Sequence, residues 1–282
     1  MSLPVAASIF RDGLFEGQHA FVTGGGTGIG FAIAAELRLL GAHVTIGSRS
    51  EQKLRDGAAR LRAIEGAGEV HWHVCNIREP DSIAAAVASA REALGPIHAL
   101  VNNGGGQFPS PAAAIRKKGW DAVIETNLTG TFSMCQAVAP DMPSGGAIVN
   151  IIAQMWNGFP MMAHTGAARA GVENLTKTLA FEWAPLGLRV NAVAPGVILS
   201  SGVDTYDDAN KRFFFESVEH IPAGRLGTPR EVAVAVTYLL SPAAGFVTGT
   251  TLRIDGGETL FGHVAANQMR AFWQAQPTEP HE

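Results

Sequence analysis

Residues 23–30 read Thr-Gly-Gly-Gly-Thr-Gly-Ile-Gly, and this stretch decides the fold that we predict for the chain. The apolar run 20–22 before it is typical of a buried strand, and residues 31–40 after it are typical of a helix. Glycines permit the sharp turn and let the backbone approach a pyrophosphate, to which the helix start offers free N–H groups. A glycine-rich turn also occurs in ordinary loops, but the flanking strand and helix favour dinucleotide binding. The predicted phosphate-binding residues are Gly24, Thr27, Gly28, Ile29 and Gly30.

Composition narrows the class of protein. The chain has 282 residues, of which 46% are hydrophobic and 16% charged, so it can bury a large core. A net charge of −4 without a basic cluster argues against binding to nucleic acid or to an anionic membrane surface. The two cysteines, Cys75 and Cys135, lie far apart and favour a reducing compartment. We find no signal-peptide pattern, no apolar run of transmembrane length and no peroxisomal address in residues 280–282, and we therefore expect a cytoplasmic enzyme.

Apolar strand-like runs alternate with helix-like segments along the chain. Because each run is almost continuously apolar, we expect parallel strands covered by helices on both faces. The expected strands are 20–22, 43–46, 70–74, 98–101, 147–152, 188–193 and 251–254, and the expected helices are 31–40, 50–64, 81–94 (capped by Asp81), 120–138, 163–183, 210–220 and 228–240. The predicted fold is α/β, a single-domain, doubly wound Rossmann fold with a seven-stranded parallel sheet. Residues 1–18 are a lead-in, 197–228 an insertion and 263–282 a C-terminal tail.

The residues at the ends of the strands predict the cofactor. An NAD-specific site usually has a carboxylate at the end of the second strand to hold both ribose hydroxyls. Ser48 there cannot repel a 2′-phosphate, and Arg49 can hold one with two hydrogen bonds, so we predict NADP; a solvated arginine is the alternative. Further cofactor candidates are Asn76 and Ile77 after the third strand, and Asn102 and Gly104 after the fourth, on the adenosine side. For Asn102, a turn residue that bonds its own backbone is the alternative.

Three possible metal ligands alternate along the third expected strand. His71, His73 and Cys75 point to one face, and imidazole and thiolate both bind zinc. No fourth ligand is evident in the sequence. We therefore predict ordinary packing at these residues and no metal.

Four further segments carry a family resemblance. They are Asn102–Gly105, Glu125–Gly130, Arg189–Gly196 and Asp255–Gly257. Together with the glycine turn they resemble the short-chain dehydrogenase/reductase family, over residues 17–262. Within that family, residues 102–112, 125–132 and 164–172 look like peroxisomal trans-2-enoyl-CoA and 2,4-dienoyl-CoA reductases, whereas 153–156 and 201–206 look more like bacterial enzymes of citronellol-type terpenoid oxidation.

The resemblance implies the position of the active site. The family has a serine after the fifth strand and Tyr-x-x-x-Lys on the following helix, and these positions are Ala153, Thr165 and Arg169 here. The two tyrosines of the chain, Tyr206 and Tyr238, lie elsewhere, so the usual proton donor is missing.

Other roles are also carried over from the family. The resemblance implies that Asn127 holds a water in a proton relay. The alternative is that Asn127 is a polar helix residue that faces solvent. We add Pro195, Gly196 and Ile198, after the sixth strand, to the cofactor candidates.

We expect an NADP-dependent reductase that transfers hydride to the conjugated C=C of an enoyl-CoA thioester. The developing charge on the thioester oxygen needs hydrogen-bond donors, which Thr165 and Arg169 on one helix face could supply. The alternatives are a dehydrogenase of terpenoid or other apolar alcohols and a catalytically silent NADP-binding protein. The resemblance also implies a homotetramer, and an insertion that covers an apolar substrate with Tyr206 and Phe214 as contacts.

Overall fold

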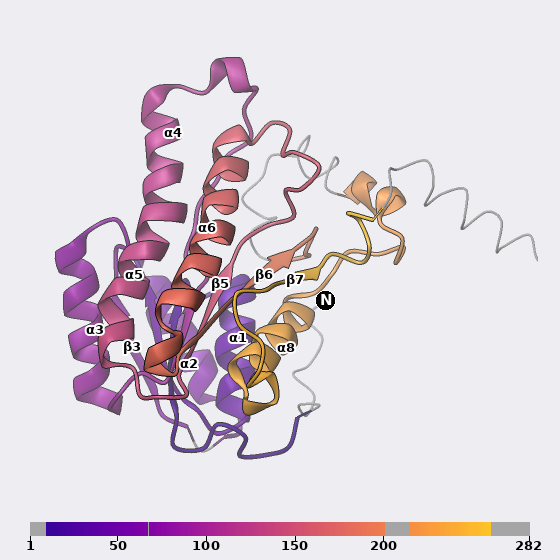
Figure 1. Ribbon diagram of the computed structural model, residues 1–282. Coiled ribbons are helices and arrows are strands. Elements are labelled where there is room, and N and C mark those ends of the chain that lie inside the picture. The colour runs from indigo at the N-terminus through magenta and orange to yellow at the C-terminus, as the bar shows by residue number, and fades with distance from the viewer. Residues whose placement is uncertain (1–9, 67, 201–214, 261–282) are drawn as a thin grey trace, which may run out of the picture.

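The computed structural model describes residues 10–66, 68–200 and 215–260. They form a seven-stranded sheet in the order β3-β2-β1-β4-β5-β6-β7, in which every neighbouring pair is parallel (Figure 1). The strands are β1 (His19–Thr23), β2 (His43–Ser48), β3 (Val70–Val74), β4 (Ala99–Asn102), β5 (Ala147–Ile151), β6 (Arg189–Pro195) and β7 (Thr251–Ile254). The predicted single-domain, doubly wound fold is confirmed.

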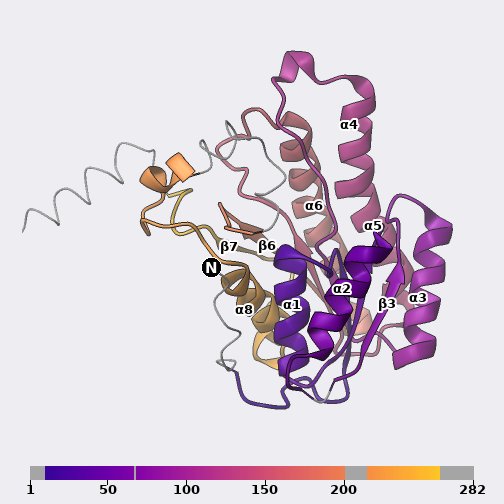
Figure 2. The same ribbon diagram turned by 180° about the vertical axis from the view of Figure 1, so that it is seen from behind.

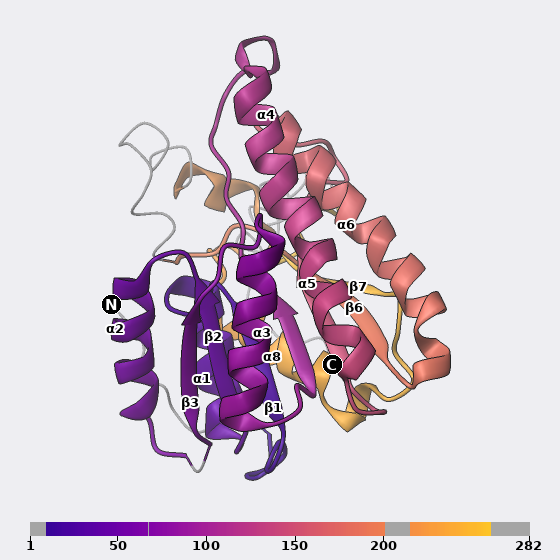
Figure 3. The same ribbon diagram turned by 90° about the vertical axis from the view of Figure 1, so that its left-hand side faces the viewer.

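Two layers of helices cover the sheet. On one face lie α1 (Gly28–Leu39), α2 (Glu51–Arg62) and α8 (Pro229–Leu240), as Figure 2 shows. On the other face lie α3 (Pro80–Leu94), α4 (Lys117–Ile124), α5 (Gly130–Val138) and α6 (Ala163–Glu182), as Figure 3 shows. Neighbouring strand residues point to opposite faces, so Val22 packs in the core under α1 and Phe21 in the core under α3.

The strand order indicates where along the sheet a ligand is expected to bind. Connections run in one direction from β1 to β3 and in the opposite direction from β4 onward, so the switch point lies between β1 and β4. Doubly wound sheets bind ligands outside the carboxyl ends of the strands at such a point. α4 and the start of α6 extend beyond this edge of the sheet (Figure 1).

Several helix boundaries differ from the expectation. The helix expected at 120–138 begins at Lys117 and is interrupted by a π-helical segment, η2 (Glu125–Thr129). Asp81 does not cap α3, because Pro80 already occupies the first turn, where its fixed φ suits a helix start. Of the helix expected at 210–220, the structure shows helix at residues 215–216 followed by the 3₁₀ turn η6 (Ser217–His220), and residues 201–214 lie outside the described residues.

A buried histidine at the opposite edge of the sheet makes folding sensitive to acid. His19 donates from Nδ1 to the Gly95 carbonyl at 3.0 Å and accepts at Nε2 from the Thr45 hydroxyl at 2.8 Å. Both ring nitrogens are therefore hydrogen-bonded when His19 is neutral. Burial lowers the pKa of His19 from 6.5 to about 4, and the neighbouring His98 and His43 lower it further, against the opposing effect of the Gly95 bond.

The free energy of unfolding is expected to fall as the pH drops from 6.5 to 4. In that range the unfolded chain binds a proton at His19 that the folded chain excludes, so the stability present above pH 6.5 is progressively lost. The loss is about 3 kcal/mol. Urea unfolding of wild type and His19→Gln at pH 7.5 and 4.5 measures it. The prediction fails if the variant keeps the full pH dependence.

Candidate functional site

The glycine turn holds α1 against β1 too closely for side chains. Gly24 and Gly28 have φ values of +67° and +57°, which residues with side chains rarely adopt. A Cβ at Gly30 would lie 2.4 Å from the Gly24 carbonyl oxygen. The first turn of α1 therefore starts at the carboxyl edge of the sheet with its N–H groups available to an anion.

The loop after β4 is fastened to this turn. The Thr23 hydroxyl accepts the backbone N–H groups of Asn103, at 3.0 Å, and of Gly104, at 2.8 Å. The Asn103 side-chain amide also donates to the Thr23 carbonyl at 3.0 Å. These bonds join the two strands that flank the switch point.

A pocket lies beside the turn, at the carboxyl ends of β1, β2 and β3. Its lining contains the cations Arg49, Lys53 and Arg78, and no carboxylate among the residues that the structure describes. The predicted residues that line it are Gly24, Thr27, Ser48, Arg49, Asn76, Ile77 and Gly104. The other lining residues were not among those predicted to bind the cofactor. They are Thr23, Gly26, Gly47, Ser50, Lys53, Cys75, Arg78, Gly105 and Thr126. This lining fits a ligand that carries phosphates.

Two cations that line the pocket but were not predicted, Lys53 and Arg78, could have been found from the sequence. Lys53 is in the first turn of α2, three residues after the N-cap Ser50, so it returns to the same edge as Arg49. Arg78 follows Asn76 by two residues. By contrast, Cys75 is a neutral thiol, because burial raises its pKa to about 11.

The other predicted cofactor residues do not line this pocket. Gly28, Ile29 and Gly30 form the first turn of α1 behind it. Gly196 donates its N–H to the Ile254 carbonyl at 3.0 Å, just after Pro195 ends β6. Ile198 is buried in the core and pairs with Gly227, so it closes the base of the 197–228 insertion.

The prediction for Asn102 is corrected. Its side chain is buried and donates to Asn150 Oδ1 at 2.9 Å and to Cys135 Sγ at 3.1 Å. Asn102 therefore points into the layer under α5, whereas the next residue, Asn103, points to the glycine turn. Alternation along the strand end decides which asparagine faces the site.

Arg169 is the buried cation of the site. It lies on α6, and its Nη1 donates to the Ile151 carbonyl at 2.8 Å. A Cβ at Gly105 would lie 2.6 Å from Arg169 Nη2 and 2.7 Å from Asn127 Oδ1, so Gly105 is where the pocket, Arg169 and Asn127 meet. Burial lowers the pKa of Arg169 to about 10, which leaves it charged at neutral pH.

Asn127, to which the family resemblance assigns the holding of a water, lies buried beside the loop after β4. Its amide accepts the Gly106 N–H at 3.0 Å and donates to the Gly106 carbonyl at 2.8 Å. Its backbone carbonyl accepts the Thr131 hydroxyl at 2.9 Å. The side chain is fully buried, so the alternative of a solvent-facing residue is wrong, and it anchors the loop after β4 beside Arg169.

Thr165 is buried one helical turn before Arg169. Its neighbour His164 was not among the predicted site residues. His164 Nδ1 accepts the Thr165 backbone N–H at 2.8 Å. The Phe108 ring packs edge-on against the imidazole, with centroids 4.4 Å apart. Burial lowers the pKa of His164, partly offset by a bond to the Met162 backbone. Tyr206 and Phe214, the predicted substrate contacts, lie outside the described residues.

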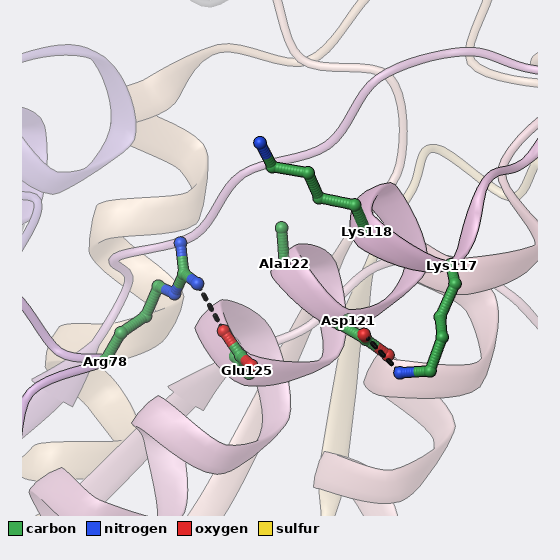
Figure 4. Close-up of a pocket in the computed structure, with 6 residues that line it drawn as sticks. All are labelled: Arg78, Lys117, Lys118, Asp121, Ala122 and Glu125. Carbon is green, nitrogen blue, oxygen red and sulfur yellow. Dashed lines mark hydrogen bonds and ion pairs between the residues drawn. The ribbon is translucent and has the colours of Figure 1, made fainter.

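A second pocket shares Arg78 with the first and follows α4 (Figure 4). Lys117 pairs with Asp121 at 2.6 Å, and Arg78 pairs with Glu125. Lys118 makes no ion pair with any described residue, and in Figure 4 its ammonium stands apart from these pairs. The pocket therefore carries one cation in excess.

The fold, the glycine turn and the residues around Arg169 define a dinucleotide-dependent oxidoreductase site. The family described as enoyl-(acyl carrier protein) reductase matches residues 24–259. The chain belongs to the short-chain dehydrogenase/reductase family.

Individual relatives cover nearly the whole chain. A probable 2,4-dienoyl-CoA reductase of Bacillus subtilis is 35% identical over 87% of this chain and 98% of its own. A peroxisomal 2,4-dienoyl-CoA reductase of Mus musculus is 36% identical over 90% of this chain and 88% of its own. A solved structure, the citronellol catabolism dehydrogenase of Pseudomonas aeruginosa, is 47% identical over 90% of this chain and 99% of that one, with a TM-score of 0.79. Both branches of the expected resemblance are thus present among the similar proteins.

In residues 10–66, 68–200 and 215–260, no helix is both long enough and apolar enough to span a bilayer.

Proposed function

We propose that the protein is an NADP-dependent reductase of the conjugated C=C of an acyl-CoA thioester. The observation that carries the proposal is the position of Arg169, a buried cation beside Gly105 and Asn127, on a helix without tyrosine. Reduction of a conjugated C=C builds negative charge on the thioester oxygen, and a buried guanidinium stabilises such charge strongly.

Oxidation of an alcohol has the opposite requirement, because a base must take the hydroxyl proton. With a pKa of about 10, Arg169 keeps its proton at neutral pH. His164 is buried next to Thr165, and burial lowers its pKa, so it adds no positive charge to that of Arg169. Arg169 thus favours stabilising charge over removing a proton.

NADP is supported by the charge of the first pocket. Arg49 and Lys53 stand next to Ser48, and the described lining has no carboxylate to repel a 2′-phosphate. When bound, the reduced cofactor would supply a hydride to the far end of the conjugated system. The electron pair moves toward the thioester oxygen, which Arg169 and Thr165 stabilise, and a proton from water adds to the α-carbon. The product has one C=C fewer.

The CoA part of the substrate is supported by the second pocket. CoA carries a pyrophosphate and a 3′-phosphate, and the pocket that adjoins the first has an excess cation, Lys118, with Arg78 and Lys117 beside it. The names of the two dienoyl-CoA reductases agree with this substrate class.

The second candidate function is oxidation of an apolar alcohol such as citronellol. It is favoured by the 47% identity to the Pseudomonas dehydrogenase. A third, a silent NADP-binding protein, rests on the substituted positions Ala153, Thr165 and Arg169.

A parallel assay separates the three. NADPH oxidation is measured with crotonyl-CoA, a long-chain 2-enoyl-CoA and a 2,4-dienoyl-CoA, and NADP⁺ reduction is measured with citronellol. We expect turnover of at least one thioester and less of citronellol. Turnover of citronellol alone supports the second candidate, and tight NADPH binding without turnover supports the third.

We also propose a homotetramer, in which the helices on the α4–α6 face pair across a two-fold axis. Large apolar side chains are exposed on each of these helices, namely Trp120, Phe132 and Phe181, the last 85% exposed. Burying such side chains against a second copy is favourable. Light scattering at micromolar concentration should give four times the chain mass of 29.6 kDa. A monomer mass would contradict the proposal.

A further inference from the structure

Two loops from neighbouring strands meet above the carboxyl edge of the sheet. One runs from β4 to α4 and contains Gly105; the other runs from β5 to α6, which carries Arg169. The backbone N–H of Ser110 in the first loop donates to the Met161 carbonyl in the second at 2.6 Å. Figure 1 shows both loops at the same end of the molecule.

Met161 has an unfavourable backbone conformation. Its φ is +64°, and it is the one residue other than glycine with a positive φ in the part of the chain that the structure describes. Here the Cβ of an L-residue crowds the carbonyl oxygen, so glycine is the usual choice. The same loop does use a glycine, Gly158, at φ +80°. Position 161 therefore holds a methionine in a strained conformation.

Packing does not account for this methionine. Its side chain is 50% exposed, so little apolar surface is buried to offset the strain. Strained residues cluster at binding sites, and an observed outlier is a ground for a functional hypothesis. The methionine side chain is flexible and polarisable, which suits contact with apolar ligands of varied shape.

A second apolar side chain accompanies it. Phe108, on the other loop, is 38% exposed and packs its ring on His164, next to Thr165. Because Ser110 ties the loops together, Phe108 and Met161 belong to one rim. Of the two rim residues, Met161 lies in the segment that immediately precedes α6, on which Thr165 and Arg169 are found.

We propose that Met161 determines chain-length specificity by contacting the apolar chain of the substrate, with Phe108 as its neighbour on the rim. This inference rests on the proposed function, which puts the polar end of the substrate at Arg169 and Thr165. The strained backbone holds the Met161 side chain half-exposed just before α6, the helix that carries Thr165 and Arg169.

The test compares two substrates and three variants. Met161→Gly and Met161→Asn remove the apolar side chain and accept a positive φ, and Met161→Leu is the matched apolar control. For the first two variants we expect kcat/KM for a dodecenoyl-CoA to fall about tenfold, with crotonyl-CoA changed less than twofold. Met161→Leu should stay within about threefold of wild type for both. Equal losses on both substrates, or no loss on the long one, would overturn the proposal.

Stability separates this role from a structural one. Met161→Gly and Met161→Asn should unfold at the same urea concentration as wild type or a higher one, because strain is relieved. A lower midpoint would mean that Met161 supports the fold, and would overturn the proposal.

The inference can also be tested if no thioester is reduced. Calorimetry with NADP present then compares dodecanoyl-CoA with free CoA, and 1-dodecanol with 1-butanol. Failure of the proposed function appears as absent thioester turnover in wild type. Failure of the inference appears as Met161→Gly binding the long-chain ligands as tightly as wild type.

Discussion

Replacing Arg169 by methionine is expected to lower kcat about 10²–10³-fold, the usual effect of removing one donor from a developing oxyanion. Arg169 is buried, charged and in contact with Gly105 at the pocket wall, whereas the cations that the pocket offers to phosphates are Arg49 and Lys53, since Arg78 pairs with Glu125. NADPH affinity should therefore change much less than kcat. Single-turnover kinetics with a 2-enoyl-CoA and titration of NADPH measure the two effects separately.

Arg169→Lys is the matched control. It keeps a cation, and lysine is the residue that the family resemblance expects at this position, so it should recover part of the lost kcat. Both variants lose or weaken the bond to the Ile151 carbonyl, so urea unfolding must accompany the kinetics. The account is contradicted if Arg169→Met keeps wild-type kcat, or if Arg169→Lys is as inactive as Arg169→Met at equal stability.

Changing the charge beside the 2′-hydroxyl position is expected to alter cofactor choice. Wild type should bind NADPH about 10- to 100-fold more tightly than NADH, as one bidentate arginine–phosphate contact provides. Ser48→Asp places a carboxylate among Arg49, Ser50 and Lys53, and should remove or reverse this preference. Arg49→Ala should weaken NADPH while leaving NADH nearly unchanged.

Dissociation constants for both cofactors, at two salt concentrations, check this prediction. Lys177→Ala is a suitable control, because Lys177 pairs with Glu173 on the exposed face of α6 and should change neither constant. Equal affinity of wild type for NADPH and NADH would show that Arg49 does not bind the 2′-phosphate.

The fold could be predicted from the sequence because its signals are local. Continuous apolar runs such as Ala147–Ile151 indicate buried parallel strands, and the glycine turn at 23–30 fixes where the first strand meets its helix. Periodicity could not reveal the π segment at Glu125–Thr129, because its 5 residues are little more than one helical turn and are too short to show a change of period.

The site could be predicted only in part. Motif spacing finds Gly24, Ser48 and Arg49, whose positions follow from the ends of single strands. Motif spacing could not decide whether Asn102 or Asn103 faces the site, because this depends on the side of the sheet toward which each side chain points.

Contacts between segments that are distant in the sequence could not be predicted. The bonds of Asn127 to Gly106 and of Ser110 to Met161 join loops that are separate in the chain. A short-range pattern carries no information about such pairs.

The central claim is that hydride reaches a carbon of an acyl thioester. The most direct measurement supplies NADPH with deuterium at the transferable C4 position, together with a 2-enoyl-CoA or a 2,4-dienoyl-CoA, and locates the label in the product by mass spectrometry. The account predicts one deuterium in the acyl chain, at the far end of the former conjugated system. An unlabelled acyl chain would contradict it, the more so if a parallel reaction with citronellal places deuterium on C1 of citronellol.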